Sequence, residues 1–192
     1  MKKLLITGFD AFGGNTLNPS WAAVERLPDT VGEYALCKLQ IPTVFGAAAQ
    51  AVLNRAKDFR PDAILCIGLA AGRDAVTPER IAVNIRDARI PDNAGNQPQG
   101  EFVVPDGPAA YFSTVDVAAM VRAIRAQDIP AAVSNTAGTY VCNDVLYTLL
   151  HHYAGTPTKV GFLHVPRLPE QGTPNLPLPT ITQALTAAIE TL

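Results

Sequence analysis

One cysteine in the second half of the chain has the surroundings of a nucleophile. Cys142 lies in the segment SNTAGTYVCNDVLY, where a predicted strand ends, a tight turn follows and a helix begins at or near the cysteine. At a helix start, unpaired backbone N–H groups and the helix dipole stabilise a thiolate and lower the thiol pKa, and the same groups can hold the oxyanion of a tetrahedral intermediate. By position alone a buried structural cysteine is the commoner outcome, so the chemistry depends on a neighbouring base.

His164 is the strongest candidate for that base. It ends the apolar run of residues 160–165, at the sheet edge where Cys142 should also emerge. Imidazole is the side chain that titrates nearest to neutral pH, although a lone histidine at a strand end is more often structural. The competitors, His151 and His152, are adjacent near the end of the predicted helix, where the dipole favours a positive charge. We expect both of them to be solvated.

A carboxylate is expected to orient the imidazole ring. Glu79 follows the apolar run Ala63–Leu69 and the segment GLAAGRDAVTP, and Asp92 lies in RIPDNAGNQP. Either could instead be a surface carboxylate or a helix cap, which is the more frequent position of acidic residues. Composition and spacing do not choose between the two.

The composition limits the class of protein. Of 192 residues, 48% are hydrophobic and 17% are charged, and 15 basic against 17 acidic residues give a formal charge of −2. These values exclude a disordered chain, and the absence of a basic cluster argues against nucleic-acid binding. No run approaches the roughly 20 apolar residues of a membrane span, and the apolar start ends at Asp10, too early for a signal peptide.

The three cysteines, Cys37, Cys66 and Cys142, are odd in number and far apart. That spacing is unlike a disulfide framework or a zinc site. Cys37 and Cys66 lie in apolar strand-like runs, where a thiol behaves as a small hydrophobic group. We therefore expect a cytoplasmic protein with two core thiols and with no metal or other cofactor.

The elements that must position these residues alternate between strands and helices. Predicted strands cover residues 4–6, 36–41, 63–69, 131–134 and 160–165, with 81–85 as a further candidate. Predicted helices cover residues 21–27, 45–59, 117–126, 142–153 and 181–192. Residues 87–108 form a long loop, a candidate lid or subunit contact. We predict an α/β fold, a three-layer α/β/α sandwich with a mostly parallel twisted central sheet, as one domain over residues 1–192. Its active site should lie beyond the carboxyl ends of the strands.

The segment GFDAFGG follows the first predicted strand, where nucleotide-binding proteins carry their phosphate loops. The dinucleotide fingerprint fails because Gly8 is followed by Phe9 and Asp10 rather than by a second glycine, and a P-loop fails because Gly14 stands where lysine is required. A non-catalytic module that binds a nucleotide or another small ligand is the alternative function, and both failures weigh against it. Phe9 and Phe12 suit a flat apolar ligand and simple packing about equally.

Taken together, the segments resemble the pyroglutamyl peptidase family (pyrrolidone carboxyl peptidases), cysteine peptidases that remove an N-terminal pyroglutamyl residue. The resemblance is carried, in chain order, by GFDAFGG, NPS, GLAAGR, TPERIAVN, RIPDNAGNQP, GPAAYFST, SNTAGTYVCN and GFLHVPRLPEQ. It implies a catalytic arrangement of Cys142, His164 and Glu79. It also implies a homo-oligomer, either a dimer or a tetramer, and a substrate pocket with Arg89 beside it, formed by Phe9, Phe12, Thr43, Ile90, Tyr140 and Val141.

The implied substrate is a peptide with N-terminal pyroglutamate, whose lactam ring carries no charge. A pocket of apolar side chains can accept this ring, while backbone groups meet its N–H and C=O. An ordinary N-terminus brings an ammonium group, and burying it without a partner costs on the order of several kcal/mol. Such a pocket would select its substrate by excluding charge.

Three positions depart from the pattern that the resemblance suggests. Leu69 stands where some relatives have glutamine, Asp116 replaces a frequent proline, and Asp144 replaces a frequent histidine. None of the three is a candidate catalytic group. We therefore expect activity to be retained, while substrate preference and local stability differ from those of close relatives.

Overall fold

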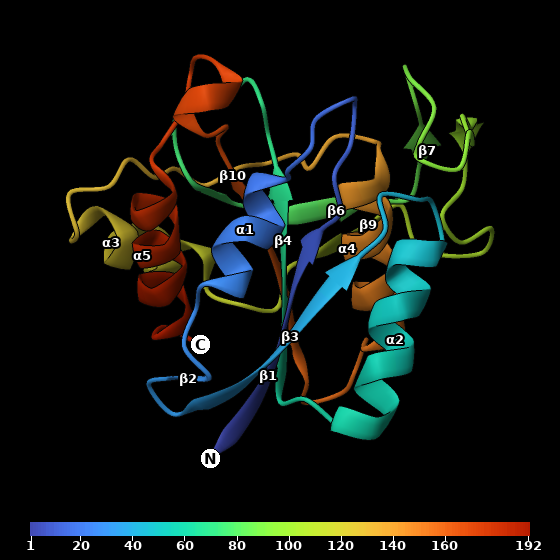
Figure 1. Ribbon diagram of the computed structural model, residues 1–192. Coiled ribbons are helices and arrows are strands. Elements are labelled where there is room, and N and C mark those ends of the chain that lie inside the picture. Colours follow the sequence, from blue (N-terminus) through green and yellow to red (C-terminus); the bar gives the residue numbers. More distant parts are fainter.

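A twisted six-stranded sheet forms the centre of the computed structural model, which describes all residues 1–192 (Figure 1). Four parallel strands, β3 (Tyr34–Ile41), β1 (Lys2–Phe9), β4 (Ala63–Leu69) and β10 (Lys159–Val165), lie side by side in this order. Short antiparallel strands close the two edges, β2 (Thr30–Val31) beside β3 and β5 (Thr77–Pro78) beside β10. Since parallel strands end at the same edge, the sheet brings the residues after β1, β4 and β10 together.

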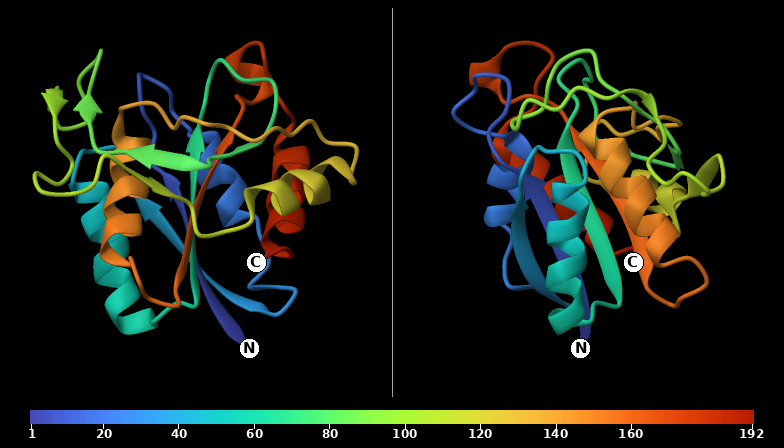
Figure 2. Two further views of the ribbon diagram at one scale, coloured as in Figure 1. Left: turned by 180° about the vertical axis from the view of Figure 1, so that it is seen from behind. Right: turned by 90° about the vertical axis from the view of Figure 1, so that its right-hand side faces the viewer.

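Helices cover both faces of the sheet (Figures 1 and 2). One face carries α1 (Pro19–Glu25), α3 (Val117–Arg125) and α5 (Leu178–Ile189), and the other carries α2 (Ala47–Phe59) and α4 (Val141–His152). Along β1, Leu4 and Ile6 pack into the first apolar core, and Leu5 packs into the second. This alternation follows from the two-residue period of a strand, and it confirms the predicted three-layer α/β/α sandwich.

The predicted elements agree with the structure for most of the chain. The strand at 63–69 has the predicted bounds. The other main strands are longer than predicted, and the helices are shifted or shortened by one to three residues. Asn18 caps α1 as expected, because its Oδ1 accepts a hydrogen bond from Ser20 N at 3.1 Å and Pro19 occupies the first helical position. None of the helices combines the length and the apolar sequence that a membrane crossing requires.

The predicted strand at residues 131–134 is wrong, because this segment makes only isolated bridges with residues 76–79. Ala132 N donates to Val76 O at 3.1 Å, and Ser134 N donates to Pro78 O at 2.9 Å. The bond that should lie between them needs an N–H at position 78, and proline has none. One proline thus interrupts a ladder that the apolar sequence would otherwise allow.

The long segment 87–108 is not wholly irregular. Two short antiparallel pairs hold its ends, β7 (Arg86–Asp87) with β8 (Gln99–Glu101), and β6 (Ile81–Val83) with β9 (Ala110–Phe112). The last short element, η1 (Pro169–Gln171), follows β10. These pieces lie around the carboxyl edge of the sheet (Figure 2), and residues 81–112 add only Ala82 and Val103 to the buried residues of the second apolar core.

Candidate active site

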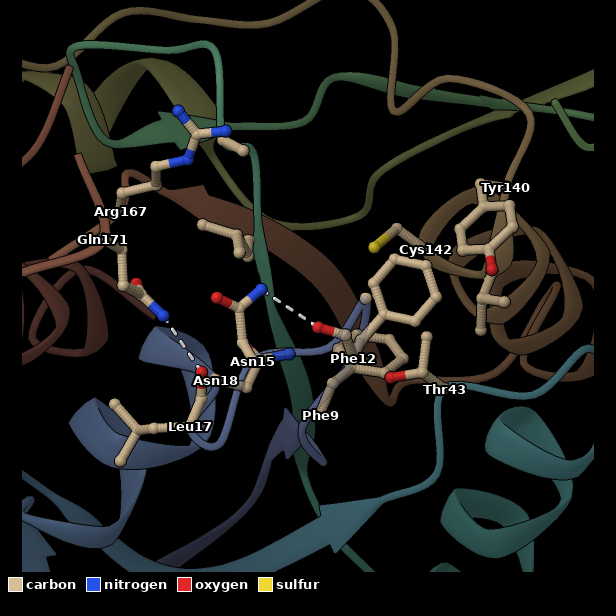
Figure 3. A pocket seen from close by; sticks show the side chains of 14 residues that line it. Phe9, Phe12, Asn15, Leu17, Asn18, Thr43, Tyr140, Cys142, Arg167 and Gln171 are labelled. Carbon is tan, nitrogen blue, oxygen red and sulfur yellow. Dashed lines mark hydrogen bonds between the residues drawn. The ribbon is translucent and has the colours of Figure 1, made fainter. Parts of the chain in front are cut away.

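A cavity of about 310 Å³ lies at the carboxyl ends of β1 and β4 and beside the chain that leaves β10 (Figure 3). It is lined by aromatic and aliphatic side chains, several amides, one thiol and one guanidinium. The lining residues are Phe9, Phe12, Gly13, Asn15, Leu17, Asn18, Thr43, Leu69, Ala71, Tyr140, Val141, Cys142, Arg167 and Gln171.

Cys142 is the second residue of α4, and it is half-buried against this cavity. No side chain caps the helix, and its backbone bonds begin with Asp144 N donating to Tyr140 O at 3.1 Å. The backbone N–H groups of Val141, Cys142 and Asn143 therefore have no protein acceptor. These N–H groups are available to an oxyanion that forms next to the sulfur.

The absence of a side chain at Gly68 gives the thiol its space at the sheet edge. A Cβ at this position would lie 2.9 Å from Cys142 Sγ and 2.8 Å from Phe162 Cζ, closer than real contacts allow. In the parallel register of β4 and β10, Gly68 is paired with His164. The sulfur thus packs over the strand position beside the histidine.

His164 and Glu79 form a buried pair on the same edge. His164 Nδ1 lies 2.7 Å from Glu79 Oε1, and the two side chains are 5% and 0% exposed. Glu79 is held in place by its backbone, since its N–H donates to Phe162 O at 2.9 Å and its carbonyl accepts from Ser113 Oγ at 2.6 Å. His164 makes this side-chain hydrogen bond and none to Cys142, so its Nε2 is free to serve as a base.

Asp92, the other carboxylate considered for this role, organises its own loop. Its Oδ1 accepts from Ala94 N at 2.9 Å and from Asn96 N at 2.8 Å, and its Oδ2 accepts from Phe45 N at 2.9 Å. None of its hydrogen bonds involves His164. The structure therefore pairs the imidazole with Glu79.

Arg73 completes the buried group, and the sequence analysis did not single it out. Its Nη1 donates to Glu79 Oε1 at 2.6 Å, the same oxygen that His164 contacts, and its Nη2 donates to Thr136 O at 2.9 Å. Arg73 lies inside the segment GLAAGR that carried part of the family resemblance. The motif was therefore a signal, but only the fold shows which carboxylate the arginine meets.

The protonation states differ from those expected for a cysteine at a helix start. Burial raises the pKa of the Cys142 thiol to about 12, and the Glu79 carboxylate adds to this increase. Burial also lowers the pKa of His164 below 6.5, against the opposing effect of Glu79. The expectation of a lowered thiol pKa is therefore wrong in the free protein, because burial penalises the thiolate more than Arg73 and the Cys142 backbone N–H favour it. At neutral pH the site contains a thiol and a neutral imidazole.

Known proteins identify the family. The pyroglutamyl peptidase family profile matches residues 2–192. This chain belongs to the pyroglutamyl peptidase family. It is 49% identical to a pyrrolidone-carboxylate peptidase of Levilactobacillus brevis, over 99% of this chain and 97% of the relative. Its fold matches the crystal structure of pyroglutamyl peptidase I from Bacillus amyloliquefaciens with a TM-score of 0.97 at 45% identity, over 100% and 96% of the two chains. Pyrrolidone carboxyl peptidase from Thermococcus litoralis matches with a TM-score of 0.95 at 36% identity, over 100% and 93%.

Most of the predicted pocket residues line one side of the cavity of this chain. Phe9, Phe12, Thr43, Tyr140 and Val141 all line it, and the Phe12 and Tyr140 ring centroids lie 5.6 Å apart. Arg89 and Ile90 do not line it, since both are exposed and the Ile90 residue is 52% accessible. Their loop supports the pocket from behind, because Tyr140 Oη donates to Pro91 O at 2.9 Å and Asn93 N donates to Thr43 O at 3.0 Å.

The other side of the cavity was missed by the sequence analysis. It includes Leu17, Arg167 and Gln171, and Figure 3 places Arg167 and Gln171 away from Tyr140 and Thr43. Arg167 and Gln171 belong to the segment GFLHVPRLPEQ, which carried part of the family resemblance and contains His164. A signal was present in that segment, but the turn of the chain after β10 decides which side chains face the cavity.

The three departures from the family pattern have separate roles. Leu69 lines the cavity. Asp116 caps α3, since its Oδ1 accepts from Ala119 N at 2.9 Å. Asp144 is fully buried, and it accepts hydrogen bonds from Arg86 Nε at 2.6 Å and Gly46 N at 2.8 Å.

The remaining titratable candidates agree with the sequence expectation. Cys37 and Cys66 are buried in β3 and β4, and burial raises the pKa of the Cys66 thiol to about 12. His151 and His152 are exposed at the end of α4. Cys142 is therefore the one cysteine of the chain that lines the cavity.

Proposed function

We propose that this chain hydrolyses the bond after an N-terminal pyroglutamyl residue, with Cys142 as nucleophile, His164 as general base and acid, and Glu79 as the group that orients the imidazole. The supporting observation is the 2.7 Å contact of His164 with Glu79 on the strand beside Cys142. Nδ1–H of His164 donates a hydrogen bond to Glu79, and this leaves Nε2 without its proton and able to accept one from the thiol.

In the first half of the reaction, His164 Nε2 removes the Cys142 proton as the sulfur attacks the carbonyl carbon. Because burial raises the thiol pKa to about 12, the thiol needs this base to lose its proton. The developing oxyanion takes hydrogen bonds from the free N–H groups at the start of α4. The protonated imidazole then gives its proton to the departing amine, and a thioester forms as the C–N bond breaks.

In the second half, a water molecule replaces the amine. His164 takes a proton from this water, the oxygen attacks the thioester carbonyl, and the sulfur leaves with that proton restored to it. Glu79 stabilises the imidazolium in both halves, because its carboxylate is already held in contact with Nδ1. Pyroglutamate is released, and the thiol and the neutral imidazole return to their starting states.

The aromatic side of the cavity is suited to the lactam ring. Phe9, Phe12 and Tyr140 offer flat apolar surface, and none of the fourteen lining residues is acidic. An N-terminal ammonium would therefore enter without a carboxylate partner, which is unfavourable for a buried charge. The neutral lactam does not meet this penalty.

The decisive experiment is cleavage of a pyroglutamyl anilide by single cysteine variants. We expect Cys142→Ala to lose activity by at least about 10⁴-fold, because the covalent step has no substitute. Cys37→Ala and Cys66→Ala are the matched controls, and both should keep activity within roughly tenfold while folded, since neither residue lines the cavity. Substantial turnover by folded Cys142→Ala would overturn the mechanism.

Alkylation provides an independent test of the thiol and its base. Iodoacetamide should modify Cys142 faster than the buried Cys37 and Cys66 in the folded protein. Replacement His164→Gln should slow this modification at neutral pH, since no neighbouring base then accepts the thiol proton. An unchanged rate would remove His164 from the proposed role.

The proposal includes the wider organisation of the protein. We place the catalytic unit in one domain over residues 1–192, since cavity residues range from Phe9 to Gln171. The three free cysteines suit the reducing cytoplasm. Ile90, Phe102 and Phe112 are 52%, 63% and 68% exposed, which supports self-association into a dimer or tetramer. Light scattering should give a multiple of 20.4 kDa, and a monomeric mass would contradict this part.

A further inference from the structure

Arg167 is the single charged residue among the fourteen that line the cavity. The nearby Glu79 is fully buried and does not line the cavity, and its Oε1 is contacted by Arg73 and His164. The cavity thus carries one net positive charge from its lining residues. The proposed mechanism uses neither this charge nor the guanidinium.

The backbone holds Arg167 in a defined place. It lies two residues after the end of β10, and its carbonyl accepts a hydrogen bond from Leu176 N at 2.9 Å. A bridge with Asn175 further fixes this stretch. The side chain is half-buried, and its guanidinium makes no hydrogen bond or ion pair with the protein. Arginine has five N–H donors in a rigid planar fork, so this group is a ready partner for a carboxylate.

The other polar groups on this side are already engaged. Gln171 Nε2 donates to Leu17 O at 3.0 Å, Asn15 Nδ2 to Phe12 O at 3.1 Å, and Asn18 Nδ2 to Asp10 O at 2.9 Å. These three amide groups therefore hold the wall of the cavity in place by bonds within the protein. Arg167 is therefore the strongest donor left for a bound molecule on this side.

The position of Arg167 relative to Cys142 indicates which part of the substrate it would meet. In Figure 3, Phe12, Thr43 and Tyr140 lie on one side of Cys142, and Arg167 and Gln171 lie on the other. If the lactam ring occupies the aromatic side, the amine that leaves must extend toward Arg167. The charge therefore faces the residue that follows pyroglutamate.

We propose that Arg167 makes this enzyme prefer substrates with a carboxylate on the residue released, and this inference rests on the proposed function. The carboxylate can belong to an acidic side chain or to the C-terminus of a dipeptide, because both present the same two oxygens to the guanidinium fork. The preference would appear in kcat/KM, since the contact holds the leaving part during attack. Solvent reaches the half-buried guanidinium, so the effect is moderate rather than large.

The test compares isosteric substrate pairs that differ in one charge. The first pair is pyroglutamyl-glutamate amide against pyroglutamyl-glutamine amide, which probes a side-chain carboxylate. The second is pyroglutamyl-glutamine with a free C-terminus against its amide, which probes the terminal carboxylate. In the unaltered enzyme, the charged member of at least one pair should have a kcat/KM higher by roughly fivefold at low salt. The pair that responds identifies the source of the carboxylate.

The variants assign the preference to Arg167. Arg167→Gln should reduce the ratio to near one, and Arg167→Lys should retain part of it because the charge remains. Arg122→Gln is the matched control, since Arg122 is exposed on α3 and lies outside the cavity. Salt near 0.5 M should reduce the ratio in the unaltered enzyme.

The outcomes separate this inference from the function on which it rests. If no pyroglutamyl amide is cleaved, the proposed function fails. If the amides are cleaved but both ratios stay near one, or a ratio above one persists in Arg167→Gln, the carboxylate preference is overturned and the peptidase function stands.

Discussion

Two buried carboxylates, Glu79 and Asp144, lie near the start of α4. Each is paired with an arginine, and they differ in the other group that donates to them. Glu79 and Asp144 are both fully buried, and each lies 2.6 Å from a guanidinium nitrogen of an arginine whose side chain is 29% or 24% exposed. Glu79 shares its oxygen with the imidazole of His164, whereas Asp144 accepts from the backbone N–H of Gly46. An imidazole can gain and lose a proton near neutral pH, and a backbone amide cannot.

This difference assigns separate tasks to similar ion pairs. The Glu79 group is linked to proton transfer at the proposed nucleophile. The Asp144 group joins three parts of the chain, because it connects Arg86 of β7 and Gly46 at the start of α2 to the first turn of α4. A buried ion pair by itself is therefore no sign of catalysis. The group that shares the carboxylate with the arginine, an imidazole or a backbone N–H, decides whether the pair can take part in proton transfer.

The largest expected effect is on turnover, and it should separate the two carboxylates. Glu79→Gln should reduce kcat by roughly 10³- to 10⁴-fold, because the amide cannot stabilise the imidazolium or hold the same tautomer. Asp144→Asn should keep kcat within roughly tenfold at a temperature where it is folded. Steady-state kinetics on a pyroglutamyl anilide measures both. Equal losses in the two variants would remove the distinction.

Stability should change by similar amounts in the same two variants. Each substitution leaves a partly exposed arginine without its buried partner, so we expect a loss of roughly 1–3 kcal/mol in the free energy of unfolding. Urea unfolding at pH 7 measures this loss. Equal stabilities of the two variants would show that the larger loss of kcat in Glu79→Gln is a loss of catalysis. A much lower stability of Glu79→Gln would assign that loss to unfolding.

The pH dependence should belong to the Glu79 group alone. Since burial lowers the pKa of His164 below 6.5, the imidazole stays neutral on mild acidification, and the acid limb of kcat/KM should have its midpoint below pH 6.5. The unfolded chain binds this proton more readily, so His164 also makes the fold less stable as the pH falls from 6.5 toward its folded pKa. His164→Gln should therefore flatten the stability profile over this range. A midpoint above 6.5 would contradict the assignment.

The smallest effect separates the two arginines. The charge of Arg73 contributes to the low pKa of His164, so Arg73→Met should move the acid limb of kcat/KM to higher pH. Arg86→Met is the control and should leave the midpoint where it is, because Arg86 contacts Asp144 rather than the imidazole pair. Movement of the midpoint in both variants would show a general charge effect.

Much of the site could be predicted because its signals are local. Cys142 at a helix start and His164 at a strand end both follow from short patterns of apolar and turn residues. The predicted substrate pocket came from the family resemblance, and five of the six residues predicted to form it line the cavity. Ile90 does not line the cavity because its loop leaves it exposed, and no local pattern reports which way a loop side chain points.

The sequence by itself determined the α/β architecture, the sheet edge that carries the cavity, and the cysteine and histidine that lie at this edge. Each of these depends on the periodicity of neighbouring residues, which a linear chain already contains. Only the tertiary structure decided between Glu79 and Asp92, added Arg73 and Arg167, and reversed the expected shift of the Cys142 pKa. Those outcomes depend on burial and on contacts between residues far apart in the chain, and both exist only once the chain has folded.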